Sequence, residues 1–177
     1  MATLPRYSNT QILLHWLTAP LVILIIALPY FDDFFASFLG GRGGVFTLHK
    51  SLGITVLALT LIRILIRIKY GAPALLPPDA IMQQRLAKLG HYLLYTMLLL
   101  MPITGLLLNT RPINVFWLFT LQPLPLSEAV HEAAEQVHVT VQYAFIVLIV
   151  GHISMALWHY LARRDRVLPG MLPLIKD

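Results

Sequence analysis

The sequence contains no cysteine and carries little charge. Of its 177 residues, 12% are charged and 58% are hydrophobic, and the mean hydropathy is +0.74. The lack of cysteine excludes disulfides, thiolate-bound metals, iron–sulfur clusters and haem attached through thioethers. An ordinary soluble domain of this length is less apolar. We therefore expect an integral membrane protein.

Four long apolar runs predict four membrane-spanning helices, at about residues 9–30, 45–69, 80–108 and 127–164. The predicted fold is all-α, a four-helix bundle that forms one domain over residues 1–177. The net charge of +5 does not indicate nucleic-acid binding, because most basic residues flank the apolar runs. No small-residue cleavage site follows a short apolar core near the amino terminus, so no removable signal peptide is expected.

Three short motifs accompany these helices. Ser8-Asn-Thr-Gln11 has the form of a capping box and predicts the start of the first helix. Gly40-Gly41-Arg42-Gly43-Gly44 lacks the preceding strand and the lysine of a phosphate-binding loop, so residues 31–44 are expected to be a flexible connector. The second connector contains Val115–Leu121, an apolar piece with a tryptophan, which is typical of the membrane interface.

The distribution of basic residues predicts the orientation of the bundle. Four spans place both termini on one side of the membrane. That side carries ten basic residues and the other side three, so the positive-inside rule places both termini in the cytoplasm. The ten are Arg6, Arg63, Arg67, Lys69, Arg85, Lys88, Arg163, Arg164, Arg166 and Lys176, and the three are Arg42, Lys50 and Arg111. The long fourth helix is expected to project beyond the outer face over residues 127–136.

The fourth helix carries a column of histidines, His131, His138, His152 and His159. Steps of seven and fourteen residues bring each ring back to within about 20° and 40° of one direction. His138 and His152 lie ~21 Å apart along the axis, which is most of the ~30 Å hydrocarbon thickness. Ionisable groups at membrane depth need a partner. Haem iron, which accepts axial imidazole, is one such partner, and without cysteine the haem would be a b-type.

Depth sorts all seven histidines into two groups. The outer group is His49, His131 and His138, and the inner group is His15, His91, His152 and His159. A haem held by two histidines needs rings at matching depth on facing helices. The pairs His49 with His138 and His15 with His152 satisfy this requirement best.

Other roles remain open for the remaining histidines. His91 and His159 compete with His15 for the inner iron, and each could instead form a buried hydrogen bond or act at a quinone site. His131 is expected to be a solvated residue on the projecting turn. Any single intramembrane histidine could also simply bond a hydroxyl or carbonyl group of a neighbouring helix.

The chain resembles the bacterial cytochrome b561 family of dihaem membrane proteins over nearly its whole length. The resemblance rests on Arg6-Tyr-Ser, His15-Trp16, His49 with Gly53, Arg63 to Tyr70, Leu89-Gly-His91, and the pair His138 and His152. It implies two haems b, with His49 and His138 as axial ligands of the outer iron and His15 and His152 as ligands of the inner iron. It also implies a multi-pass protein of the bacterial inner membrane. The cytochrome b subunits of formate dehydrogenase and nickel hydrogenase look similar, since a fourth-helix pair of this spacing ligates both haems there.

The resemblance further implies an oxidoreductase that moves electrons from superoxide at the outer face to ubiquinone. Quinone is then expected at the inner side, where His91 and His159 are the candidate proton donors. The outer face counts against a superoxide donor, because Asp32, Asp33, Glu128, Glu132 and Glu135 outnumber its basic residues. Steering of an anion would need Arg42, Lys50 and Arg111 to cluster.

Two other functions remain open. The first is an electron-relay and anchor subunit on which a periplasmic redox protein docks, and an exposed apolar patch around residues 116–121 would favour it. The second is a small transporter that uses histidines as proton relays, and it predicts no stoichiometric haem.

Overall fold

The computed structural model describes residues 5–173 and is mainly helical. Its helices are α1 (Asn9–Tyr30), α2 (Asp32–Leu39), α3 (Arg42–Tyr70), α4 (Ile81–Leu107) and α5 (Glu128–Trp158). A π-helical turn, His159–Arg163, continues α5, and a short 3-10 turn follows at Pro169–Met171. Two strands, β1 (Ile113–Val115) and β2 (Phe119–Leu121), form an antiparallel hairpin. Helices α1, α3 and α4, and α5 with its π turn, are each long and apolar enough to cross a membrane, which confirms the four predicted spans.

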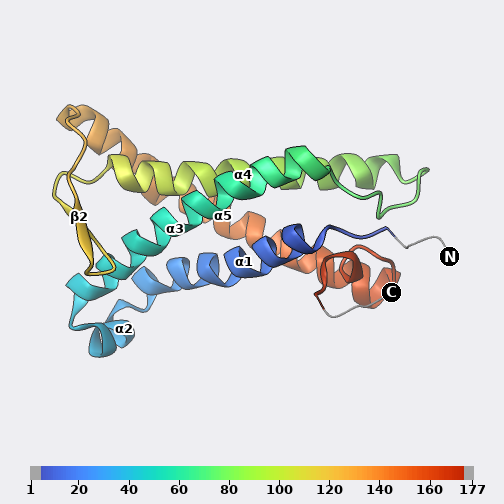
Figure 1. Ribbon diagram of the computed structural model, residues 1–177, viewed down its shortest axis with the longest axis horizontal. Coiled ribbons are helices and arrows are strands. Elements are labelled where there is room, and N and C mark those ends of the chain that lie inside the picture. Colours follow the sequence, from blue (N-terminus) through green and yellow to red (C-terminus); the bar gives the residue numbers. More distant parts are fainter. Residues whose placement is uncertain (1–4, 174–177) are drawn as a thin grey trace.

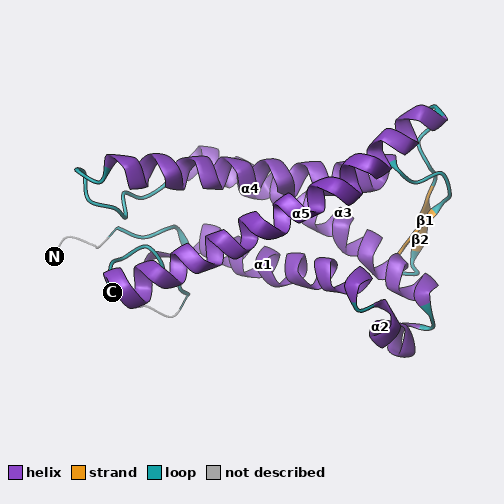
Figure 2. Cartoon of the chain, turned by 180° about the vertical axis from the view of Figure 1, so that it is seen from behind, coloured by secondary structure: helices purple, strands orange, loops and turns teal. Residues whose placement is uncertain are grey.

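The long helices lie side by side as a bundle, in which α1 packs on α3, α3 on α4, and α4 on α5. The start of α1 and the end of α5 lie at one end of the bundle (Figure 1). Helix α2 and the hairpin lie at the opposite end (Figure 2). We call the first the inner end and the second the outer end.

The bundle is held together by a central apolar cluster to which each spanning helix contributes one buried residue. These residues are Val22, Val56, Leu98 and Phe145. Many large apolar side chains point outward instead, for example Leu65, Ile68 and Val147, which are 66%, 76% and 70% exposed. An apolar exterior suits a lipid solvent. Helices can face lipid because they satisfy their backbone hydrogen bonds internally.

Helix α1 starts at the predicted capping box. The amide of Gln11 donates to Ser8 Oγ at 3.3 Å, and the amide of Ser8 donates to Gln11 Oε1 at 3.1 Å. Both groups would otherwise lack partners in the first turn.

The expectation of a flexible connector at residues 31–44 is wrong. Residues 32–39 form α2, and α3 already begins at Arg42. Gly40 and Gly41 have φ of 73° and 95°, which a glycine adopts at little cost. At Gly44 a Cβ would lie 1.8 Å from the carbonyl oxygen of Leu39. The glycine cluster therefore makes a tight corner between two helices.

The apolar piece of the second connector is a hairpin that covers the outer end. Ile113 and Val115 are buried, and Phe116 packs on the cluster formed by Leu28, Val45 and Leu52. The amide of Phe116 donates to Ser51 Oγ at 2.8 Å, which ties the hairpin to α3.

Candidate functional site

The structure brings both predicted histidine pairs together. The ring centres of His49 and His138 are 6.4 Å apart, with an angle of 78° between the planes. Those of His15 and His152 are 6.2 Å apart, with an angle of 60°. The first pair joins α3 to α5 near the outer end, and the second joins α1 to α5 near the inner end.

Both separations fit one iron between two imidazoles. An imidazole nitrogen binds a first-row metal at about 2.0–2.1 Å and the ring centre lies about 1.1 Å behind it, so opposed ligand rings have centres about 6.3 Å apart. Within residues 5–173, no group of three or more His, Asp or Glu side chains could hold a bare metal ion. If a pair held a haem, its two rings would supply two ligands of the iron and the macrocycle the others.

A proline in α1 prepares the outer site. His49 Nδ1 lies 3.0 Å from the carbonyl oxygen of Ile25. In a regular helix this carbonyl accepts from the amide four residues later, but that residue is Pro29, which has no amide hydrogen. The free carbonyl accepts the Nδ1 proton of His49. The lone pair on Nε2 then remains available to a metal.

A threonine and a glycine of α4 hold the other outer ring. His138 Nδ1 lies 3.0 Å from Thr104 Oγ1, whose hydroxyl donates to the Leu100 carbonyl at 2.8 Å. With its own proton used there, the hydroxyl oxygen accepts from His138, and Nε2 again stays unprotonated. A Cβ on Gly105 would lie 3.2 Å from Cε1 of His138. The absence of a side chain lets the ring pack against α4.

The inner site contains three rings instead of two. His152 is 6.2 Å from His15 and 5.8 Å from His91, measured between ring centres. His91 Nδ1 donates to the Ala87 carbonyl at 2.6 Å, whereas His15 Nδ1 faces Arg63 Nη2 at 3.5 Å. His91 therefore lies next to the predicted inner pair, as expected of a residue that competes with His15 for the inner iron. The His15 separation is the closer match to the ligand geometry.

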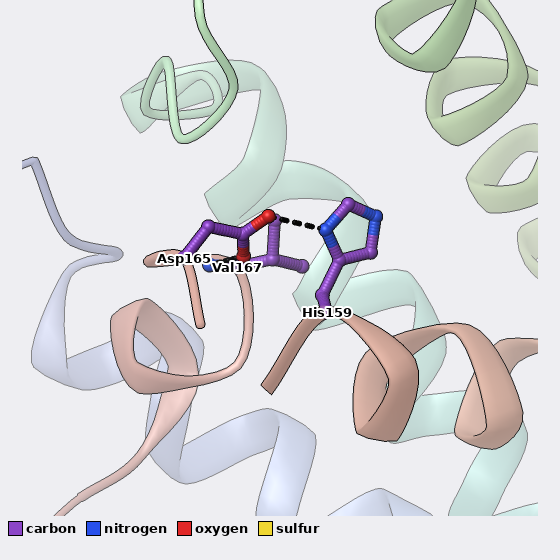
Figure 3. A network of polar contacts seen from close by, with 3 residues as sticks. All are labelled: His159, Asp165 and Val167. Carbon is purple, nitrogen blue, oxygen red and sulfur yellow. Dashed lines mark hydrogen bonds and ion pairs between the residues drawn. The ribbon is translucent and has the colours of Figure 1, made fainter. Parts of the chain in front are cut away.

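His159 belongs to a different arrangement, shown in Figure 3. The residue is 6% exposed, and Nδ1 lies 2.5 Å from Asp165 Oδ2. Asp165 Oδ1 accepts the amide of Val167 at 3.1 Å, so both carboxylate oxygens have partners. The π turn that starts at His159 lets the chain fold back and bring Asp165 to the ring. Such turns are common at functional sites.

The expectation that His131 is solvated is wrong. The residue is half-buried, and Nδ1 donates to the carbonyl of Leu107 at 2.6 Å. Leu107 ends α4, where carbonyl groups lack helical partners. His131 therefore caps one helix from another. The start of α5 extends past the end of α4 (Figure 1).

Two of the three outer basic residues have different surroundings. Lys50 adjoins His49 in the sequence and is half-buried. Arg42 instead forms an ion pair with Asp32, at 2.6 Å between Nη2 and Oδ2. That pair neutralises one of the cations available for steering an anion.

The comparisons with known proteins identify the family of the chain. The profile of the prokaryotic cytochrome b561 family matches residues 6–174. The chain belongs to this family. It is therefore a multi-pass protein of the bacterial inner membrane that takes part in electron transfer, and its family implies haem b.

Three relatives show how the family match is distributed. Cytochrome b561 homolog 2 of Escherichia coli K12 is 33% identical over 172 residues, which covers 94% of this chain and 91% of the relative. Cytochrome b561 homolog 1 of the same organism is 30% identical and covers 95% and 97%. A Yersinia pestis protein named probable superoxide oxidase CybB is 28% identical and covers 95% and 96%. Each match spans nearly the whole of both chains.

Several residues of the site escaped the sequence analysis. Pro29 signals a free carbonyl at Ile25, but the facing histidine is known only from the packing of α1 on α3. Thr104 belongs to an ordinary apolar helix sequence. Asp165 lies six residues after His159. Two residues at this spacing point in different directions in a regular helix, and only the π turn brings them together.

Proposed function

We propose that this chain forms one dihaem domain that transfers electrons from superoxide at the outer face to ubiquinone at the inner face. The observation that carries the proposal is the presence of two imidazole pairs with ligand spacing, one near each end of the bundle. Haem iron between two imidazoles takes up and releases single electrons. Two superoxide ions give two electrons and two dioxygen molecules, and these electrons with two protons convert quinone to quinol.

The chain supplies ligand geometry and a dry path between its two ends. His49 and His138 would hold the outer haem, and His15 and His152 the inner haem. The central cluster of Val22, Val56, Leu98 and Phe145 lies in the bundle and excludes water. The family relative named probable superoxide oxidase supports superoxide as the donor. The excess of basic residues at the inner end supports cytoplasmic termini.

Quinone reduction also needs protons, and the inner end has groups that can deliver them. His159 is held by Asp165, whose carboxylate accepts the Nδ1 proton and orients the ring. His159 follows His152 by seven residues, about 10 Å along the helix axis. His91 lies beside His152 itself. We therefore place the ubiquinone site between the start of α4 and the end of α5.

The test is a spectroscopic turnover experiment on the purified protein. We expect two low-spin haems b per chain in a pyridine haemochrome assay. Superoxide should reduce both haems, and a soluble ubiquinone should reoxidise them. A single haem, or a mainly high-spin spectrum, would contradict the ligand pairs. Full haem content without reduction by superoxide would contradict the donor alone.

A second function is favoured by the tip of the hairpin. Trp117, Leu118 and Phe119 are 53%, 81% and 56% exposed, so the outer end presents an apolar patch on which a periplasmic redox protein could dock. In that case the chain would be an electron-relay and anchor subunit. Replacing Leu118 by Ser would then slow electron transfer from the partner and leave reduction by superoxide unchanged. Shielding of the Trp117 side chain by lipid in reconstituted vesicles would instead assign the patch to the membrane interface.

A further inference from the structure

The inward face of α3 carries two arginines near the inner end. Arg63 and Arg67 are one helical turn apart and so share a face. Both are half-buried, whereas Leu65 and Ile68, on the opposite side of the same turns, are 66% and 76% exposed. Charged side chains at this depth are costly and usually have a specific partner.

The described chain gives these arginines only neutral partners. Arg63 lies over the ring of Tyr95 and Arg67 over the ring of Tyr7, each at 5.5 Å. Arg67 also donates to the carbonyl of Gly71 at 3.3 Å. Within residues 5–173, the ion pairs closer than 4.0 Å are Arg42 with Asp32 and His159 with Asp165. Two guanidinium groups therefore share one region in which residues 5–173 supply no carboxylate.

A small cavity lies between these side chains. Its volume is about 30 Å³, and its polar lining comes from Tyr7, Gln11, Arg63, Arg67 and Tyr95. One water molecule needs about 10–15 Å³ on this measure, so the space has room for a small polar group such as a carboxylate.

The contact between Arg63 and His15 is a further reason to expect an anion beside Arg63. If iron takes the lone pair on Nε2 of His15, the ring proton must reside on Nδ1. Nδ1 can then no longer accept a hydrogen bond from Arg63 Nη2, which lies 3.5 Å away. The guanidinium needs another acceptor, and the cavity adjoins it. A carboxylate matches its planar fork.

We propose that Arg63 and Arg67, with Tyr7 and Tyr95, form a carboxylate pocket that holds the propionates of the inner haem. The charge of Arg63 beside His15 also raises the reduction potential of the inner haem above that of the outer haem. This inference rests on the proposed dihaem function. Local charge and hydrogen bonding are the means by which a protein sets a haem potential. Electron transfer from the outer to the inner haem is then downhill.

The experiment measures reduction potential and haem retention in the full-length protein. Arg63→Gln, Arg67→Gln and Arg63→Lys are compared with Lys69→Gln, a matched control that removes an exposed charge from the same helix end. Each is also made together with His49→Ala, which removes the outer haem and leaves the inner one to be titrated alone. Apomyoglobin serves as the haem acceptor in the retention assay.

Arg63→Gln should lower the potential of the inner haem and leave that of the outer haem unchanged. Arg67→Gln should release the inner haem faster, on the order of tenfold, as is usual when a group supporting a metal site is removed. Arg63→Lys keeps the charge but loses the fork, so it should keep the potential and still release haem faster. Lys69→Gln should behave as the parent protein. If Arg63→Gln yields no folded protein, the other two variants carry the test.

The outcomes separate this inference from the proposed function. Unchanged potential and unchanged retention in all three arginine variants would overturn the propionate pocket while the dihaem function stands. The pocket would then serve another anion, such as a lipid headgroup. A parent protein without an inner haem would overturn the proposed function itself.

Discussion

The outer and inner histidine pairs have nearly equal ring separations but are supported in different ways. At the outer end, both Nδ1 atoms have neutral oxygen acceptors, the carbonyl of Ile25 and the hydroxyl of Thr104. At the inner end, His15 faces the cation of Arg63, and within residues 5–173 the structure gives the His152 ring no hydrogen bond. Hydrogen bonds prepare the outer site before a metal binds. Charge dominates the inner site, and the rings of His15 and His152 need a ligand to fix their tautomers.

This contrast indicates a division of labour along the bundle. The outer end presents one imidazole pair held by neutral acceptors, which suits one-electron exchange. The inner end adds two arginines, a third imidazole and the pair of His159 with Asp165. The histidines suit a reaction that needs protons as well as electrons. The arginines suit the anionic edge of a cofactor. The predictions below test this contrast, from the largest effect to the smallest.

Removing one ring of a pair should remove one haem completely. His138→Ala should delete the outer haem and keep the inner one, and His152→Ala should do the reverse, because each iron needs both imidazoles. Haem content per chain and low-temperature spectra measure the loss. His49→Ala and His15→Ala should reproduce the two patterns. If His91→Ala abolishes a haem and His15→Ala does not, the inner pair is His91 with His152.

Replacing the buried ring of His159 should affect quinone only. His159→Leu should leave both haem spectra intact and slow reoxidation by ubiquinone about 10²-fold, the usual loss when a positioned proton donor is removed. Stopped-flow absorbance after reduction provides the rate. Asp165→Asn, which keeps the shape but loses the charge, should slow the same step less. Unchanged rates in both His159→Leu and His91→Leu would place the quinone site elsewhere.

Removing the hydroxyl that holds His138 should weaken the outer haem selectively. Thr104→Val keeps the volume and removes the acceptor for Nδ1, so retention of the outer haem should fall on the order of tenfold. Thr96→Val is the matched control, because Thr96 is on the same helix, bonds the Tyr92 carbonyl in the same way and is exposed. Equal haem loss in both variants would mean that the effect is general to α4.

Restoring an amide in α1 should produce the smallest change. Pro29→Ala supplies the hydrogen that Pro29 lacks, and that amide would compete with His49 for the carbonyl of Ile25. A carbonyl oxygen has two lone pairs, so the bond to His49 should weaken without breaking. We expect a small shift of the outer haem potential and an unchanged inner haem. A shift of the inner haem instead would show that the proline acts through the bend of α1.

The sequence predicted the spans and the histidine pairs well because both depend on strong periodic signals. Runs of apolar residues determine helix position in a membrane, so the bounds of α1, α3, α4 and α5 agree closely with the predicted ranges. The spacing of His138 and His152 alone places one ring near each end. Depth then limits which rings can meet.

The groups around the rings could not be predicted, because they depend on contacts between helices. Nothing at Ile25 identifies His49 as its partner before α1 is packed on α3. The glycine cluster was taken for a flexible connector because glycine favours both flexibility and tight corners, and only the close approach of Leu39 to Gly44 distinguishes them. His131 was misassigned for a similar reason, since its acceptor is the end of another helix.

Every close histidine pair in the described chain includes a ring from α5: His49 with His138, His15 with His152, and His91 with His152. During translation this helix leaves the ribosome last. A nascent chain that has inserted only α1, α3 and α4 contains His15, His49 and His91, and none of these rings has its partner yet. Both sites therefore become complete in one late event, the insertion of α5. If these pairs hold haem as proposed, haem loading waits for the end of synthesis, and a chain truncated before α5 lacks both pairs.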